Sequence, residues 1–177
     1  MALERLQNAG VKVIPVTAAP AGWCDQMAWM WPVDGVIGEN GGVFFRRQND
    51  GHGIERFFWH GTEKYPDVAE RLMQIGEQIK REIPAAHFAD DQPFRMTSIA
   101  FAKPPEAHQC SLILNALTQA GATTTVNNLW ILGWSGEYDK LSMARRVLRD
   151  YYDLDIDAER SAVLYSGDST NDAPRFS

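Results

Sequence analysis

Two carboxylates and one carboxamide lie close together near the C-terminal end of the sequence, at Asp168, Asn171 and Asp172. They follow residues 161–166, whose apolar centre predicts a β-strand, and Gly167, which ends that strand. Oxygen ligands at the carboxyl end of a buried strand suit a hard cation such as Mg²⁺, and ligands of open α/β sheets bind at that edge. A short polar turn also forms for purely structural reasons, but the run Gly-Asp-Ser-x-Asn-Asp-x-Pro is more specific. The pattern predicts a metal site with Asp168 as the first choice of ligand.

Two further polar residues lie at the ends of predicted elements. Thr17 ends an apolar strand predicted over residues 11–16, and Lys140 lies at the start of a helix predicted to reach Tyr151. Taken singly, a threonine at a strand end is most often structural, and a lysine in a first helical turn is most often solvated. Together with the acidic cluster they form a set that suits a phosphate, because a hydroxyl donates, an ammonium adds charge and a metal bridges.

Apolar spacing, glycines and prolines predict the elements that position these groups. The first part of the chain is predicted to form helices over residues 3–9 and 20–31 and short strands over residues 35–38 and 43–45. The middle is predicted to form strands over residues 54–59, 94–102 and 123–133, and helices over residues 66–83 and 104–120. This order indicates an α+β module at residues 46–135, inserted into an α/β domain with a parallel sheet made of residues 1–45 and 136–177.

The composition is that of an ordinary globular protein. The formal net charge of -6 gives no indication of a nucleic-acid partner. No apolar run approaches the roughly 20 residues of a membrane span, and the first residues lack the core of a signal peptide. Cys24 and Cys110 are best explained as two thiols in a reducing cytosol. We therefore expect a cytoplasmic protein with no nucleic-acid and no membrane partner.

The order of these motifs resembles the haloacid dehalogenase (HAD) superfamily of phosphohydrolases. Thr17 matches the end of its second motif, Lys140 its third, and residues 167–172 its fourth. The turn Asn40-Gly41-Gly42 is similar to one in the subgroup with a type IIB cap, which includes sucrose-phosphate and mannosyl-phosphoglycerate phosphatases. The resemblance implies a Rossmann-like core with a parallel sheet and an inserted α+β cap domain.

The resemblance also implies an activity and a role for each matching residue. The activity is Mg²⁺-dependent hydrolysis of a phosphate monoester through an aspartyl-phosphate, acting on a small phosphorylated metabolite such as a sugar phosphate. Thr17 and Lys140 would be catalytic and would bind the transferred phosphoryl group, with Asn40 also binding phosphate or substrate. Asp168 would bind the metal, with Asn171 and Asp172 acting directly, through water or by orienting the lysine.

Two departures from the family pattern shape the expectation. Ala19 stands where the family often has arginine, and the first motif, an apolar strand ending in Asp-x-Asp, is absent. No aspartate precedes Asp25, which lies in a predicted helix, so no residue is assigned as the nucleophile. We therefore expect a core that is incomplete at both termini, in a fragment that is inactive alone. We also expect another segment to fill the place of the central strand, either by strand complementation or in a homodimer.

Other interpretations stay open on the sequence alone. The chain could be a non-catalytic remnant that binds a phosphorylated ligand or a protein partner, or a relative of sugar phosphomutases. Trp59, Trp130 and Trp134 lie in or beside the insert, where aromatic faces could stack on a sugar, although core packing explains them better. The four histidines show no spacing that suits zinc.

Overall fold

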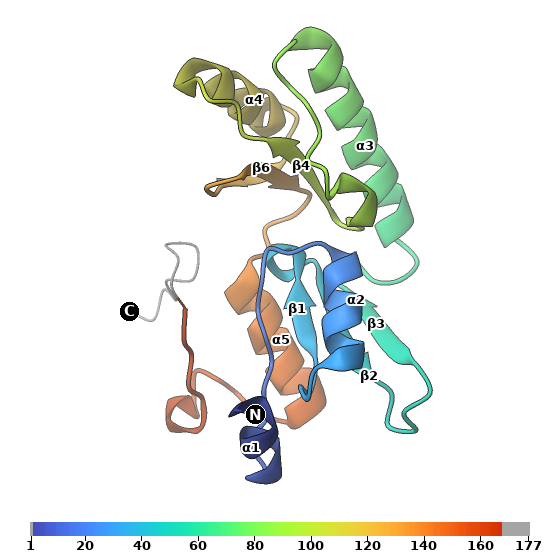
Figure 1. Ribbon diagram of the computed structural model, residues 1–177, viewed down its shortest axis with the longest axis vertical. Helices are drawn as coiled ribbons and strands as arrows, with labels where there is room; N and C mark the ends of the chain where they lie inside the picture. The colour runs from blue at the N-terminus through green and yellow to red at the C-terminus, as the bar shows by residue number, and fades with distance from the viewer. Residues whose placement is uncertain (1, 168–177) are drawn as a thin grey trace.

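The computed structural model describes residues 2–167, which form two units, one above the other in Figure 1. The first unit contains α1 (Ala2–Asn8), α2 (Ala21–Met30), β1 (Val36–Gly38), the short helix η1 (Glu39–Gly41), β2 (Val43–Arg47), β3 (Ile54–Phe58), α5 (Lys140–Tyr152) and the short helix η3 (Arg160–Ala162). The second contains α3 (Tyr65–Glu82), the short helix η2 (Gln92–Phe94), β4 (Ser98–Ala102), α4 (Ala107–Gln119), β5 (Thr123–Val126) and β6 (Trp130–Trp134). None of the described helices is both long enough and apolar enough to cross a membrane.

The sheet of the first unit is antiparallel, in the order β1-β2-β3, and lies between α2 and α5 (Figure 1). Side chains alternate between the two faces of a strand. Val43 and Phe45 accordingly pack in the cluster that includes α2, whereas Phe44 packs with Met143 and Val147 of α5. The sheet therefore needs both helices, which come from opposite ends of the sequence.

Residues 11–16 are extended beside β1, but they form only one β-bridge, the parallel pair Val16–Ile37. The backbone bonds Ile37 N to Pro15 O and Thr17 N to Ile37 O, both 2.9 Å, hold this segment in place. From its apolar residues we expected a buried strand over residues 11–16, and this was wrong, because a single β-bridge forms and Val11 is 46% exposed. Among the described residues, the segment has a strand neighbour on the β1 side only.

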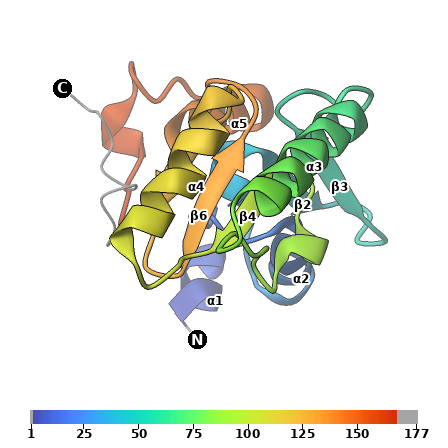
Figure 2. The same ribbon diagram turned by 90° about the horizontal axis from the view of Figure 1, so that it is seen from above.

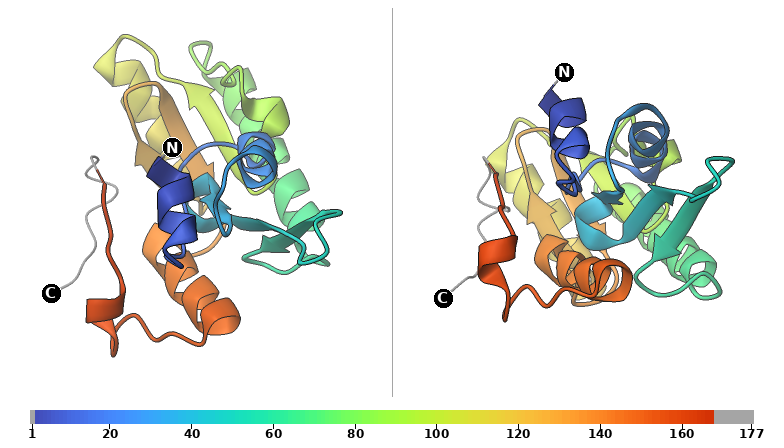
Figure 3. Two further views of the ribbon diagram at one scale, coloured as in Figure 1. Left: turned by 60° about the horizontal axis from the view of Figure 1, so that its bottom comes forward. Right: turned by 90° about the horizontal axis from the view of Figure 1, so that it is seen from below.

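The strand predicted over residues 161–166 does not form. The chain there makes η3 and then runs without β-bridges, standing apart from the first sheet in the views of Figures 1 and 3. Leu164 is 96% exposed. A strand is held by hydrogen bonds to a neighbour, and no described strand lies beside this one. The apolar run alone could not reveal that.

The second unit is a three-stranded antiparallel sheet, in the order β4-β6-β5, with α3 and α4 covering one face (Figure 2). The strand predicted over residues 123–133 is in fact two strands, β5 and β6, joined by a turn at Asn127. The Asn127 Oδ1 accepts hydrogen bonds from the backbone N–H groups of Leu129 and Trp130 and so forms the turn. The strand expected near residue 54 also forms, but as β3 it pairs with β2 in the first sheet rather than in the insert. The domain boundaries at residues 46 and 135 remain a prediction.

Most predicted helices form with bounds close to those expected. Gly10 has φ 76° just beyond α1, as its role as a helix-ending glycine requires. In α2 the inward residues are Ala21, Cys24 and Ala28, whereas Trp23 and Met30 are 62% and 74% exposed. Neither described cysteine is in a disulfide.

Candidate functional site

Thr17 lies at the end of the extended segment beside β1, where its backbone N–H is held by the carbonyl of Ile37. Its side-chain Oγ1 accepts a hydrogen bond of 3.1 Å from the N–H of Ala19. A threonine hydroxyl has one proton to donate, and that proton has no acceptor within the part of the chain that the structure describes. The hydroxyl is thus oriented by the backbone and can still donate to a ligand.

Asn40 lies in the turn after β1, directly beside Thr17. Its backbone N–H donates to the Thr17 carbonyl over 3.2 Å. Asn40 is only 5% exposed, yet its side-chain Nδ2 has no hydrogen-bond partner within residues 2–167. Leaving a buried donor without a partner costs about 1–3 kcal/mol of folding free energy. The Asn40 amide is therefore well placed to donate a hydrogen bond to a ligand oxygen.

Lys140 is the first residue of α5 and lies against the same turn. A methyl group on Gly41 would overlap the carbonyl of Asp139, so the turn and the start of α5 are in direct contact. Asp139 caps the helix by accepting from the N–H of Ser142 (2.7 Å), while the Ser142 hydroxyl accepts from the Asp139 N–H (2.8 Å). The N-terminus of a helix favours bound anions. The structure therefore brings Thr17, Asn40 and the start of α5 together around one turn.

The predicted metal ligands Asp168, Asn171 and Asp172 lie outside the described residues. Within residues 2–167, no group of three histidine, cysteine, aspartate or glutamate side chains is placed to hold a metal ion. The metal site thus remains a prediction from the sequence.

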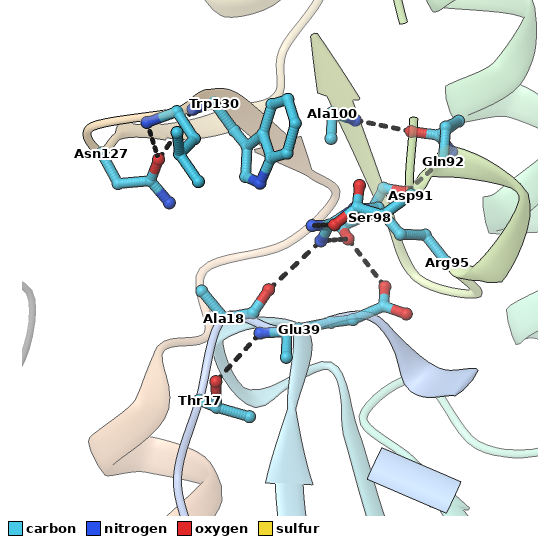
Figure 4. A network of polar contacts seen from close by, with 12 residues as sticks. Thr17, Ala18, Glu39, Asp91, Gln92, Arg95, Ser98, Ala100, Asn127 and Trp130 are labelled. Carbon is cyan, nitrogen blue, oxygen red and sulfur yellow. Dashed lines mark hydrogen bonds and ion pairs between the residues drawn. The ribbon is translucent and has the colours of Figure 1, made fainter. Parts of the chain in front are cut away.

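Two charged residues near the site escaped the sequence analysis, Glu39 and Arg95. Glu39 is fully buried and binds backbone and hydroxyl groups at the start of β4, in the second unit. Arg95 lies in the second unit and donates to the carbonyl of Ala18, the neighbour of Thr17 (Figure 4). A glutamate in a turn and an arginine before a strand normally indicate solvent-exposed positions, so the sequence carries no signal for these contacts.

The aromatic residues beside the site mostly serve packing. Trp134 is 5% exposed, and its Nε1 donates to the carbonyl of Tyr138 over 3.0 Å, which confirms core packing at that position. Trp59 packs against Tyr138 and the guanidinium of Arg146. Trp130 is half-buried at the edge of the same cluster, together with Ala18 of the first unit. The contact surface between the units is therefore aromatic.

Burial controls the ionisation of two groups near this surface. Burial, with a smaller contribution from Glu39, raises the pKa of the Cys24 thiol to about 12. Burial also raises the pKa of the Tyr138 hydroxyl, which donates to the Thr97 carbonyl over 3.4 Å. Both groups are therefore neutral near pH 7, and neither serves as a base or nucleophile there.

None of the protein-family models matches the chain, and none of the curated proteins matches its sequence. Solved structures do match. Protein 0175 of Thermoplasma acidophilum is 23% identical, with a TM-score of 0.71 over 97% of this chain and 69% of that one. The sucrose-phosphatase of Synechocystis, solved with sucrose and phosphate, is 14% identical, with a TM-score of 0.65 over 97% and 69% of the two chains.

A third likeness is to a phosphatase of the HAD enzyme superfamily from Bacteroides thetaiotaomicron. It is 18% identical, with a TM-score of 0.60 over 98% of this chain and 70% of that one. The chain thus spans about seven tenths of the length of each of these three proteins. The agreement covers both the first unit and the insert, which confirms the expected fold class. The chain therefore shares the fold of these solved proteins, one of which is a phosphatase of the HAD enzyme superfamily, with an α/β unit and an inserted α+β unit.

Proposed function

We propose that this chain is part of a Mg²⁺-dependent phosphatase that hydrolyses a small phosphorylated metabolite such as a sugar phosphate. The observation that carries the proposal is the turn at Asn40, which lies beside Thr17 and against the start of α5 and holds a buried amide with no partner among the described residues. All three features donate hydrogen bonds or favour negative charge. Two of the solved proteins with this fold, from Synechocystis and Bacteroides thetaiotaomicron, are phosphatases, which agrees with the proposal.

In this proposal each group has a separate task. The Thr17 hydroxyl donates to one phosphoryl oxygen, and the Asn40 Nδ2 donates to another. Lys140 supplies positive charge at the N-terminus of α5, where the helix dipole has the same sign. Donors that are fixed before charge develops stabilise a transition state more than mobile donors do, because no reorganisation is needed during the reaction.

The chemistry of the donor set fits Mg²⁺. Asp168, Asn171 and Asp172 offer only oxygen and amide groups, and Mg²⁺ prefers a few carboxylate oxygens with phosphate and water. When bound, the cation would neutralise phosphate oxygens. In our proposal Asp168 binds the metal directly, and Asn171 and Asp172 bind it directly, bind it through water or orient Lys140.

We also propose that a further β-strand lies beside residues 11–16 in the functional molecule, either from elsewhere in the same protein or from a second copy. Within the described residues this side has no strand neighbour, and the segment after η3, which contains Leu164, forms no β-bridge to the sheet. Open strand edges invite pairing with another strand.

The test of the proposed function is hydrolysis of p-nitrophenyl phosphate by the complete enzyme, with and without Mg²⁺. Asp168→Ala should abolish Mg²⁺-dependent hydrolysis, and Asn40→Ala should lower it and weaken inhibition by orthophosphate. Retained activity of Asp168→Ala at saturating Mg²⁺ would contradict the metal assignment. Asp157→Asn is the matched control, because Asp157 forms an exposed surface pair with Arg145.

A further inference from the structure

Two buried charged side chains reach from one unit of the protein into the other. Glu39 belongs to the turn after β1 in the first unit and is 0% exposed. Arg95 precedes β4 in the second unit, and its side chain is 1% exposed. Burying a charge is expensive unless it is hydrogen-bonded on every side, so their partners indicate what these residues do.

The carboxylate of Glu39 accepts five hydrogen bonds. Its Oε1 accepts from the backbone N–H groups of Ala21 (2.9 Å) and Met96 (2.8 Å). Its Oε2 accepts from the N–H of Thr97 (2.8 Å), the Thr97 hydroxyl (2.9 Å) and the Ser98 hydroxyl (2.7 Å). Four of these five donors belong to the second unit, so a single side chain of the first unit holds the start of β4.

Arg95 makes the reciprocal connection. Asp91 fixes the guanidinium with two bonds, of 3.1 and 2.8 Å. The free edge of the guanidinium donates from Nη1 to the carbonyl of Ala18 and to the Ser98 hydroxyl, both over 3.2 Å. Ser98 thus accepts from Arg95 and donates to Glu39, which joins the two charges in one network (Figure 4). We call Glu39, Ser98, Arg95 and Asp91 the clasp.

The clasp is connected to the backbone of the candidate site in two places, by a hydrogen bond to Ala18 and by the peptide bond between Glu39 and Asn40. Ala18, which Arg95 holds, follows Thr17 directly. Asn40 follows Glu39, and both residues have left-handed backbones, with φ 57° and 48°. A left-handed backbone is unfavourable for glutamate, which has a Cβ, and the five hydrogen bonds to the Glu39 carboxylate help to hold the turn in this conformation. Releasing Glu39 would let this turn relax and would move Asn40.

We propose that Glu39 and Arg95 are positioning residues, which hold the second unit in one orientation above Thr17 and keep the Asn40 amide at the phosphate site. The role of Asn40 at a phosphate site rests on the proposed function, whereas the fixed orientation of the second unit does not depend on it. Removing one member of a buried charged network leaves the others uncompensated. Turning one unit relative to the other would therefore break several of these hydrogen bonds together.

The fixed orientation can be measured as a distance between the two units. Gln26 in α2 and Asn115 in α4 are both exposed. Spin labels attached to the variants Gln26→Cys and Asn115→Cys, combined in one protein, report this distance by electron–electron double resonance. Cys110 is replaced by serine, and the buried Cys24 stays unlabelled. We expect one narrow distance peak in the reference protein and a broadened or shifted peak in Glu39→Gln and Arg95→Met. Asp157→Asn breaks an exposed bidentate pair with Arg145 and should leave the peak unchanged.

Ser98→Ala is the milder variant, which keeps the experiment decisive if loss of either charge prevents folding. It removes only the hydroxyl shared by the two charges, so it should broaden the peak while near-ultraviolet circular dichroism shows a folded protein. A broad peak in the reference protein would overturn the proposal. A peak equally narrow in the reference protein and in every folded clasp variant would overturn it as well.

Titration of the same proteins with orthophosphate by calorimetry tests the link to the site. We expect folded clasp variants to bind phosphate about tenfold more weakly, because misplacing binding groups by about 1 Å has effects of this size or larger. Unchanged affinity in variants with a broadened peak would overturn the link to the site. If the complete enzyme fails to bind orthophosphate in the presence of Mg²⁺, the proposed function is contradicted, while the distance measurement still decides the clasp.

Discussion

The two sheets of this protein differ in how completely they are enclosed. The sheet of the second unit packs against α3 and α4, and Ile99, Phe101, Ile113, Leu117 and Ile131 are all 0% exposed. The first sheet is equally buried between α2 and α5. Beside it, however, residues 11–16 have a strand neighbour on one side only, and Val11 and Leu164 are 46% and 96% exposed.

The difference follows from where the partners lie along the chain. The second unit is made from one continuous stretch, α3 to β6, so its own helices and strands supply the apolar surface of the cluster between the sheet and α3 and α4. The first unit depends on elements from both ends of the sequence, and within the described residues one side of it is uncovered. The core of the second unit should therefore be closed and sensitive to the loss of a buried side chain, whereas the sheet of the first unit should be able to pair with another strand.

The largest effect is expected inside the second unit. Leu117→Ala removes a fully buried side chain from its cluster and should lower the free energy of unfolding by about 2–5 kcal/mol. Urea unfolding measured by circular dichroism gives the value. Leu112→Ala on the same helix, where the leucine is 41% exposed, is the control and should cost much less. Equal losses for both variants would show that this core is not closed.

The contact between the units should be the next most sensitive place. Gly42→Ala would put a methyl group into Thr97 Oγ1 and within 2.8 Å of Tyr138 Oη, so we expect a loss of about 1–3 kcal/mol in the free energy of unfolding. Gly22→Ala is the control, because its methyl group would meet only the side chain of Phe94, at 3.1 Å, on an exposed surface. Thermal unfolding compares the two. A neutral Gly42→Ala would mean that the units separate easily.

Alkaline pH tests the inner face of the first sheet, where Cys24 is buried. Because its folded pKa of about 12 lies above the ordinary 9.0, the unfolded chain ionises first between pH 9 and 12. Stability should therefore be unaffected below about pH 9 and fall as the pH rises, by at most about 1.4 kcal/mol per pH unit from this thiol. Tyr138 adds a loss of the same sign.

The Cys24→Ala variant isolates the contribution of the thiol. Its unfolding free energy, measured by urea titration at several pH values from 8 upward, should fall less steeply than that of the parent protein. The slopes are compared rather than the absolute values, because the substitution also changes packing. Identical slopes would show that this face of the sheet is open to water.

The smallest effect is expected at Leu164, on the uncovered side of the first unit. Leu164→Ala should change the free energy of unfolding by less than about 0.5 kcal/mol, because an exposed side chain loses no burial. Urea unfolding at two protein concentrations provides the measurement. A loss above about 1 kcal/mol that grows with concentration would show that a second copy covers this segment.

Local pattern was enough to predict most of the elements, while the candidate site that it indicated stays a prediction. Apolar spacing and end signals predicted the helices, because capping and periodicity act over a few neighbouring residues. Gly10 after α1 and Asp139 before α5 are examples. The order of Thr17 and Lys140 along the chain also resembles the haloacid dehalogenase superfamily, and a solved member of that superfamily has a similar fold.

Only the tertiary structure decided which strands find partners and which polar groups are buried. Residues 161–166 looked as apolar as a strand, but no strand of the described part of the chain lies beside them, and β3 joined the first sheet rather than the insert. Glu39 looked like a solvated turn residue and is instead the centre of a buried network. The physical reason is the same in each case. The pairing of strands and the burial of polar side chains depend on residues far away in sequence, such as Ser98 for Glu39. The local sequence around a residue does not predict these contacts.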